Sequence, residues 1–195
     1  GPGRDRRALS AMIGRVADAS VRPATDDDAP ALARIQAAVW ARVHADRLPA
    51  EVLEVVGSEG AAAQWRSAVT EPPSPRHRVL TALAGERVVG FAALAPASDP
   101  DTIPSLDGEL LVLCVDPSDT GAGHGSRLVN AVADLARIDG VRHLHSWLAD
   151  DEADLRAFLV GSGWAADGAT RSLDLLGDDA VLVQQSRLRT ALVDP

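Results

Sequence analysis

Apolar positions recur along the chain with two periods, and the changes of period divide it into strands and helices. Compact apolar runs bounded by turn residues predict strands, whereas apolar residues three and four positions apart predict helices. The predicted strands are residues 20–23, 78–84, 87–95, 109–115, 141–149, 170–176 and 180–188, and the predicted helices are residues 25–42, 48–56, 58–69, 126–138 and 150–163. The order is therefore of the mixed α/β type.

No repeat and no linker interrupts this order, so the pattern predicts one domain. The opening Gly-Pro-Gly is typical of a stretch left by tag removal. We expect residues 1–18 to be a tag remnant and an N-terminal extension, and residues 19–195 to form the domain. The polar segment at residues 96–108 is long for a connection, and loops of that length are often functional.

The composition narrows the class of protein. The chain has 195 residues, of which 46% are hydrophobic, enough for one full-sized globular core. No apolar run approaches the ~20 residues that span a bilayer, and no signal peptide is evident, so we expect no membrane partner. A single cysteine, Cys114, excludes an internal disulfide framework and fits a reducing cytosol, so we expect a cytoplasmic protein. The formal net charge of −9 argues against general nucleic-acid binding.

A glycine-rich turn follows the strand at residues 109–115 and precedes a helix. Its glycines, Gly121, Gly123 and Gly125, stand two residues apart. A strand, a glycine turn and a helix leave free N–H groups and the positive end of the helix dipole directed at one place, which suits a phosphate. The spacing does not fit a Rossmann fingerprint, and a P-loop needs a lysine, which the chain lacks. The turn therefore predicts a phosphate site of another kind.

Several sequence features occur together around this turn. A Val-x-Pro step, Val115-Asp116-Pro117, ends the strand, the turn at residues 120–125 opens the helix, and residues 152–164 form a helix and turn of similar pattern to a known motif. In these features, and in the order of its elements from residue 21 to residue 188, the sequence resembles the GNAT family of N-acetyltransferases. The resemblance implies a single GNAT-like α/β domain, in which helices flank a mixed, mainly antiparallel sheet and the acyl-CoA site lies at the strand, glycine turn and helix.

The resemblance also implies how acetyl-CoA, the acyl donor of that family, binds. Backbone N–H groups of residues 121–126 hold the pyrophosphate, and residues 113–115 pair with the pantetheine arm as an added strand would. No metal is expected. The cofactor-binding residues on this interpretation are Leu113, Cys114, Val115, Gly121, Ala122, Gly123, His124, Gly125, Ser126, Arg127, Glu152 and Leu159.

The chain departs from the family pattern at four positions. Thr120 and Ala122 stand where basic or amide side chains are common, so phosphate binding has to rest on backbone donors and Arg127. Glu152 stands at the usual asparagine, and a carboxylate does not donate a hydrogen bond as an amide does. Leu159 stands at the usual tyrosine, the family's acid for the departing thiolate, and the chain contains no tyrosine.

Two strand residues are candidates for catalysis. Glu109 is the candidate base, because it begins the strand that leads to the thioester and the resemblance places a Gly-Glu-Leu segment there; a solvent-facing carboxylate is the alternative. His143 and His145 share one face of the next strand with Trp147. His145 is the second candidate, as a proton relay, with a metal-binding pair or an ordinary half-buried strand residue as alternatives.

The acceptor pocket is expected at the end of the first helix. Trp40 and His44 lie there and are the candidate substrate-binding residues, with simple packing or surface exposure as the alternative. Cys114 is interpreted as a small strand residue, because a covalent acyl-enzyme is unusual in the family. In the glycine turn, the backbone of His124 is expected to matter more than its ring.

We therefore expect an acetyl-CoA-dependent N-acetyltransferase that moves an acetyl group to a primary amine by direct attack. A lysine-like amine with a pKa near ~10.4 needs about 4–5 kcal/mol to lose its proton at pH 7, whereas a thiol near ~8.5 is about 2 kcal/mol from its anion, so a base matters more than an acid. A small-molecule amine, a protein lysine and a protein N-terminus remain open as acceptors. A catalytically silent acyl-CoA-binding regulatory module is the alternative, and the sequence indicates no oligomeric state.

Overall fold

The computed structural model of the chain describes residues 19–175 and 177–192; the predicted tag remnant and extension at residues 1–18 lie outside this part. Within it, seven strands form one open sheet in the order β1-β2-β3-β4-β5-β7-β6. The strands are β1 (Ala19–Pro23), β2 (Arg78–Ala84), β3 (Arg87–Pro96), β4 (Asp107–Val115), β5 (His143–Ala149), β6 (Ala165–Asp174) and β7 (Leu182–Ala191). All neighbours are antiparallel except β4 and β5, which confirms the expected mixed, mainly antiparallel sheet.

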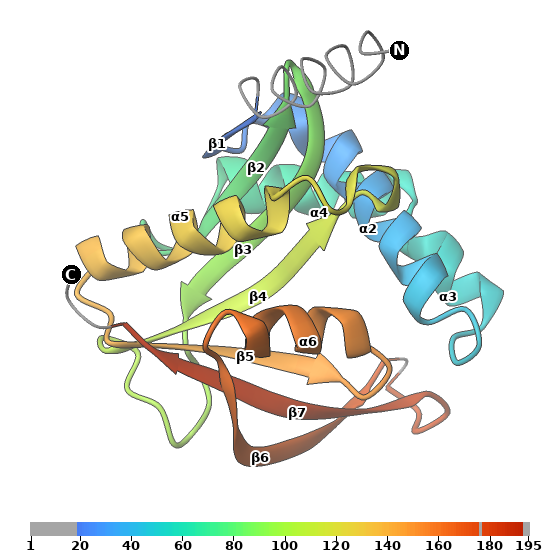
Figure 1. Cartoon of the computed structure of the whole chain (residues 1–195). Helices are drawn as coiled ribbons and strands as arrows, with labels where there is room; N and C mark the ends of the chain where they lie inside the picture. The colour runs from blue at the N-terminus through green and yellow to red at the C-terminus, as the bar shows by residue number, and fades with distance from the viewer. Residues whose placement is uncertain (1–18, 176, 193–195) are drawn as a thin grey trace, which may run out of the picture.

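Helices cover both faces of the sheet (Figure 1). Helices α2 (Ala29–Val43), α3 (Ala50–Val56) and α4 (Glu59–Thr70) lie toward one face, and α5 (His124–Ile138) and α6 (Ala153–Gly161) toward the other. Two short 3-10 turns, η1 (Asp26–Asp28) and η2 (Pro117–Asp119), precede α2 and the glycine turn. No described helix is long and apolar enough to cross a membrane.

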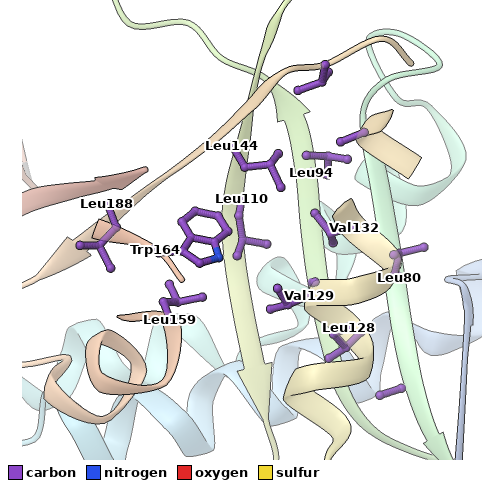
Figure 2. Close-up of a cluster of buried hydrophobic side chains, with 14 of the residues drawn as sticks. Leu80, Leu94, Leu110, Leu128, Val129, Val132, Leu144, Leu159, Trp164 and Leu188 are labelled. Carbon is purple, nitrogen blue, oxygen red and sulfur yellow. The ribbon is translucent and has the colours of Figure 1, made fainter. Parts of the chain in front are cut away.

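Each face of the sheet has its own apolar core. On the first face, Leu128 and Val132 of α5 pack against buried strand residues that include Leu110, and Figure 2 shows this cluster extending to Trp164 and Leu188. On the second face, Leu32 and Ile35 of α2 pack against residues of β3 and β4. Alternation of side chains along β3 and β4 supplies both cores, because successive residues of a strand point to opposite faces.

A bulge in β4 sets the geometry of the site. Ala93 of β3 pairs with Val112, and Leu94 pairs with Leu110, so Leu111 has no partner of its own. A bulge bends a strand and increases its twist. On its other side β4 pairs with β5 only over residues 107–109, and the two strands then diverge (Figure 1). Among the described residues, the rest of β4 therefore has no strand partner on this side.

Most predicted elements are present, with shifted ends. The hairpin over Gly85, where φ is +62°, is confirmed, as is the end of α5 at Asp139. The first helix begins later than expected, at Ala29, because residues 26–28 form a 3-10 turn. β6 begins earlier than expected, at residue 165, because it pairs with β7 beyond the predicted apolar run.

Candidate active site

The glycine turn forms a cradle of backbone amides at the start of α5. Gly121 and Gly123 have φ values of +78° and +81°, a left-handed conformation that side chains disfavour. Within the described residues, no backbone N–H from residue 121 to residue 126 donates a hydrogen bond to the protein. Unbonded amides at the positive end of a helix dipole suit the binding of an anion.

Arg127 lies over this cradle. Its Nη1 donates a hydrogen bond to the carbonyl oxygen of Ala122 at 2.9 Å. A Cβ added to Gly123 would lie 3.2 Å from the same nitrogen, so the guanidinium packs directly on the turn. A Cβ on Gly125 would instead face the ring of Phe158 at 3.5 Å. Gly121 and Gly123 therefore serve the turn's backbone shape, whereas a side chain at Gly125 would make ordinary van der Waals contact with Phe158.

The ring of His124 is buried beneath the turn. Its Nδ1 has no hydrogen-bond partner within the described residues, and burial, with the nearby Arg127 charge, lowers the pKa of the imidazole. The neutral ring is enclosed by protein.

Ion pairs brace the segment between β4 and the turn. Arg34 of α2 donates to Asp116 at 3.0 Å, and Arg87 of β3 donates to both carboxylate oxygens of Asp119 at 2.8 Å. Asp116 also accepts from the amide of Ser118, and this bond, with Arg34, holds the pKa of its carboxyl below the usual range. The turn is thus tied to two neighbouring elements.

The free edge of β4 presents backbone groups toward the gap beside β5. The amide of Asp116 donates to Val89 of β3 at 2.7 Å. Because successive residues of a strand direct their N–H and C=O groups to opposite sides, Val115 and Leu113 direct theirs away from β3, toward the gap. This edge leads directly into the amide cradle.

A cavity of about 360 Å³ opens between the diverging strands and α2. Trp40 and His44 line it from α2, which places both predicted acceptor residues at its wall. The remaining lining residues come from the bulged part of β4, the end of β5, the segment that starts α6, and the β6–β7 hairpin; they include Leu111, Leu113, Cys114, Trp147, Asp151, Glu152, Asp154 and Gln185.

His44 contacts Asp151, a residue that was not predicted from the sequence. Its Nδ1 lies 2.6 Å from Oδ2 of Asp151, and its ring meets the ring of Trp40 edge-on at 5.4 Å. Arg47 lies 3.8 Å from the other oxygen of Asp151. The only sequence signal for Asp151 is the acidic run at residues 150–152 directly after a strand.

Glu152 and Cys114 are buried groups of the same cavity. Oε2 of Glu152 accepts a hydrogen bond from the amide of Ala149 at 2.6 Å, and burial raises the pKa of its carboxyl. Burial raises the pKa of the Cys114 thiol to about 12. Cys114 therefore stays a neutral thiol, as expected for a packing residue and not for a nucleophile.

Glu109 lies at the start of β4, beside the cavity. It is paired in register with His145, and on β5 His145 shares a face with Trp147, which lines the cavity. Burial, and then the negative charge of Asp99, raises the pKa of the Glu109 carboxyl. Glu109 itself does not line the cavity within the described structure, so it is a buried carboxylate next to the cavity and not one facing bulk solvent.

His145 is buried in a network of its own. Its Nε2 lies 3.0 Å from Oδ1 of Asp107, and Nδ1 of His143 lies 3.3 Å from the same oxygen. Asp167 lies 4.0 Å from Nδ1 of His145. The two histidines thus share a carboxylate, and within the described residues no group of three or more His, Cys, Asp or Glu side chains is placed to hold a metal ion.

A buried arginine, Arg187, binds three carboxylates near Glu109 and Trp147. Arg187 of β7 donates to Asp99 at 3.1 Å and Asp167 at 2.7 Å, and it also forms a bidentate pair with Asp101. Through this last pair the pKa of Asp101 is lowered to about 2. The long loop at residues 97–106 is therefore fastened to β7, next to Trp147 and Glu109.

Leu159 belongs to the hydrophobic core. Its side chain has no exposed surface and packs in the cluster that contains Trp164 and Leu188 (Figure 2). It does not line the cavity. The expected contact between Leu159 and a cofactor is therefore not available in this structure, because Leu159 lies on the side of α6 that packs into the core.

Comparison with known proteins identifies the family. Residues 40–161, more than half of the chain, match the acetyltransferase (GNAT) family. The chain belongs to this family. No curated protein sequence gives a match.

Solved structures share the fold. The PaiA N-acetyltransferase from Thermoplasma acidophilum, in complex with coenzyme A, has a TM-score of 0.69 at 15% identity, covering 89% of this chain and 98% of that one. A GCN5-related N-acetyltransferase from Rhodopseudomonas palustris has a TM-score of 0.66 at 22% identity, covering 89% and 95%. A protein named YncA from Salmonella typhimurium, with its cofactor acetyl-CoA, has a TM-score of 0.64 at 18% identity, covering 91% and 95%.

Proposed function

We propose that the protein transfers an acetyl group from acetyl-CoA to a primary amine by direct attack of the amine on the thioester. One observation carries the proposal: an edge of β4 without a strand partner leads into a cradle of unbonded amides at the start of α5. That arrangement suits one extended ligand with a hydrogen-bonding arm and a phosphate end. Two structural relatives bind coenzyme A and acetyl-CoA respectively, which supports the same ligand here.

The donor would bind mainly through backbone groups. Amides of residues 121–126 hold the pyrophosphate, and Arg127 adds positive charge above them. Leu113 and Val115 pair with the pantetheine arm as a neighbouring strand would. An amide of the same edge also meets the oxyanion that forms when the amine adds to the thioester carbonyl.

Glu109 accepts the proton of the attacking amine on this proposal. Its raised pKa brings the carboxylate closer to the pKa of an amine, which improves proton transfer near neutral pH. His145, paired with Glu109 and bonded to Asp107, positions the start of β4 and exchanges protons behind Glu109. The thiolate takes a proton as it leaves.

The cavity favours a cationic amine as the acceptor. Asp151, Glu152 and Asp154 line it, against a single arginine, Arg42. Trp40 offers an aromatic ring that attracts a cation. We also propose a cytoplasmic location, because the one cysteine is buried and unpaired.

A thiol-release assay with a panel of amines tests the proposal. Small diamines, amino-acid amides, and peptides with a free N-terminus or a lysine would each be incubated with acetyl-CoA, whose binding is measured separately by calorimetry. At least one amine is expected to release coenzyme A faster than buffer alone. Binding without any amine-dependent release would favour a catalytically silent acyl-CoA-binding module, an alternative that the absence of tyrosine from the chain supports. Absence of acetyl-CoA binding would contradict both the acetyltransferase and the silent module.

A further inference from the structure

An imidazole–carboxylate pair faces the cavity from the helical side. His44 ends α2, where its N–H donates to the carbonyl of Trp40 at 2.8 Å, and its ring is held between Asp151 and the Trp40 ring. Since Nδ1 is bonded to the carboxylate of Asp151, Nε2 is the nitrogen left for a ligand. Within the described residues Nε2 has no partner, and it is open to the cavity instead of being enclosed.

His44 and Glu109 lie at different places relative to the cavity, so they would meet different parts of a bound ligand. The pantetheine arm of a ligand bound at the amide cradle would follow the edge of β4 past Val115 and Leu113 to the bulge. Glu109 lies beyond the bulge. His44, Cys114 and Glu152 all line this cavity. His44 therefore lies beside the arm, whereas Glu109 lies on the side of the acyl group.

In a thioester the sulfur is the last atom of the arm, and the acyl carbon comes one bond later. A group that lines the cavity beside the end of the arm can reach the sulfur, and a group beyond the bulge can reach the attacking nitrogen. On the basis of the proposed acetyl transfer, we propose that His44, oriented by Asp151, is the acid that protonates the departing thiolate.

The step balances as follows. The amine nitrogen bonds to the thioester carbon, and Glu109 takes one proton from that nitrogen. The C–S bond breaks, its electron pair goes to sulfur, and the proton on Nε2 of His44 moves to the sulfur, which leaves as the thiol of coenzyme A. Solvent then reprotonates His44 and takes the proton from Glu109.

Asp151 keeps the ring in one orientation through this cycle, because its carboxylate accepts from Nδ1–H whether or not Nε2 carries a proton. The other charged groups around the pair are Glu152 and Asp154 of the segment that starts α6, Arg47 beside Asp151, and Arg42 of α2. Asp151 is thus a positioning residue, and His44 is the group that touches the reacting atom.

His44→Asn is the informative variant. Asparagine places its amide nitrogen near the position of Nδ1, so it still donates to Asp151, and it has no equivalent of Nε2. We expect its kcat to fall at least tenfold while its Kd for coenzyme A changes less than about threefold. Any fall of kcat at high pH that belongs to this acid should be absent from the variant. His77→Asn, in a loop where His77 contacts Ser74, is the matched control and should behave as the wild type.

A binding measurement tests the position of His44 without turnover. The imidazole signals of the wild type are titrated by NMR in the free protein, with coenzyme A, and with a coenzyme A analogue that lacks the sulfur atom; the spectrum of His44→Asn assigns the signal. We expect coenzyme A to shift the titration of His44 and the sulfur-free analogue to leave it closer to the free protein. Asp151→Asn, which loses the charge but keeps an acceptor, should lower kcat less than His44→Asn.

The outcomes separate the two proposals. Equal titration of His44 with both ligands, or full kcat in His44→Asn, overturns the acid role and leaves the acetyltransferase proposal standing. A wild type that binds coenzyme A but releases none with any amine overturns the acetyl-transfer proposal and the acid role with it. A sulfur-dependent shift together with the loss of kcat and of any such fall at high pH supports both.

Discussion

Glu109 and His145 are the last residues that β4 and β5 share, and beyond this pair the two strands separate. The pair therefore stands at the point where the sheet opens. Two residues farther along β4, the unpaired Leu111 marks the bulge, and the cavity begins there. A buried carboxylate next to an open strand edge is well placed to exchange a proton with a ligand in that gap.

Glu109→Gln should lower kcat/KM about a hundredfold at neutral pH, because glutamine keeps the shape of the side chain and cannot accept the amine proton. Since the pKa of Glu109 is raised, wild-type activity should fall as the pH drops through that raised value, in addition to the loss caused by amine protonation. The variant should lack this additional fall. A pH profile of kcat/KM with a single amine measures it, and identical profiles would remove Glu109 from the mechanism.

The same variant has a stability signature. A carboxyl whose pKa is raised in the folded protein contributes stability below its unfolded pKa of ~4.3, and this contribution is lost as the pH rises through the folded value. Glu109→Gln should therefore melt at a higher temperature than the wild type at pH 7 and at a similar temperature at pH 4. Calorimetric scans at both pH values test this, and a lower melting temperature at pH 7 would show that the ionised carboxylate is stabilised by its neighbours.

Gly123→Ala should weaken coenzyme A binding more than tenfold. Its φ of +81° strains any side chain by about 1–2 kcal/mol, and the new Cβ, 3.2 Å from Nη1 of Arg127, would push the guanidinium away from its place on the turn by a small amount. Gly140→Ala is the matched control at the other end of α5, where φ is +79° and a Cβ meets nothing within 4 Å. Both variants should lose similar stability in thermal denaturation, but only Gly123→Ala should lose affinity in calorimetry. Equal affinities would contradict the phosphate cradle.

Arg187→Met should destabilise the protein by about 3–5 kcal/mol, because the largely buried carboxylates of Asp99 and Asp167 would lose their shared cation. This corresponds to a fall in Tm of roughly 10 °C for a chain of this size. The pKa of Asp101, lowered to about 2, makes the stabilisation present above the ordinary Asp pKa and lost as the pH falls from about 4 toward 2. The difference between wild type and variant should shrink in that window, whereas Arg187→Lys should show an intermediate loss at pH 7. A difference that is independent of pH would contradict the linkage.

Leu159→Tyr should destabilise the core without raising turnover. Leu159 is enclosed by residues that include Trp164 and Leu188, so a tyrosine overpacks the cluster at about 1–3 kcal/mol. Leu159→Met, of similar volume, should lose less than about 1.5 kcal/mol. Denaturant unfolding and thiol release measure the two effects. A rise in turnover for the tyrosine variant would place residue 159 at the departing thiol and contradict its assignment to the core.

The sequence by itself determined those helices, strands and turns whose conformation depends on residues close together in the chain. Glycines at 121 and 123 permit the left-handed backbone that the turn adopts, and the apolar spacing after them favours a helix that packs on one face, so a glycine turn before a helix was predictable. The strand of Glu109 and the hairpin over Gly85 were predictable for the same local reason.

Only the tertiary structure decided which residues meet around the cavity. The bulge at Leu111 exists only through pairing with β3, because register is a property of two strands and not of one. His44 and Asp151 are 107 residues apart in the chain and meet at 2.6 Å only because α2 packs across the diverging strands. Leu159 resembles a site residue by its place in a motif, yet the packing of α6 on the sheet turns it into the core, since burial of an apolar side chain is favoured over exposing it to a ligand gap.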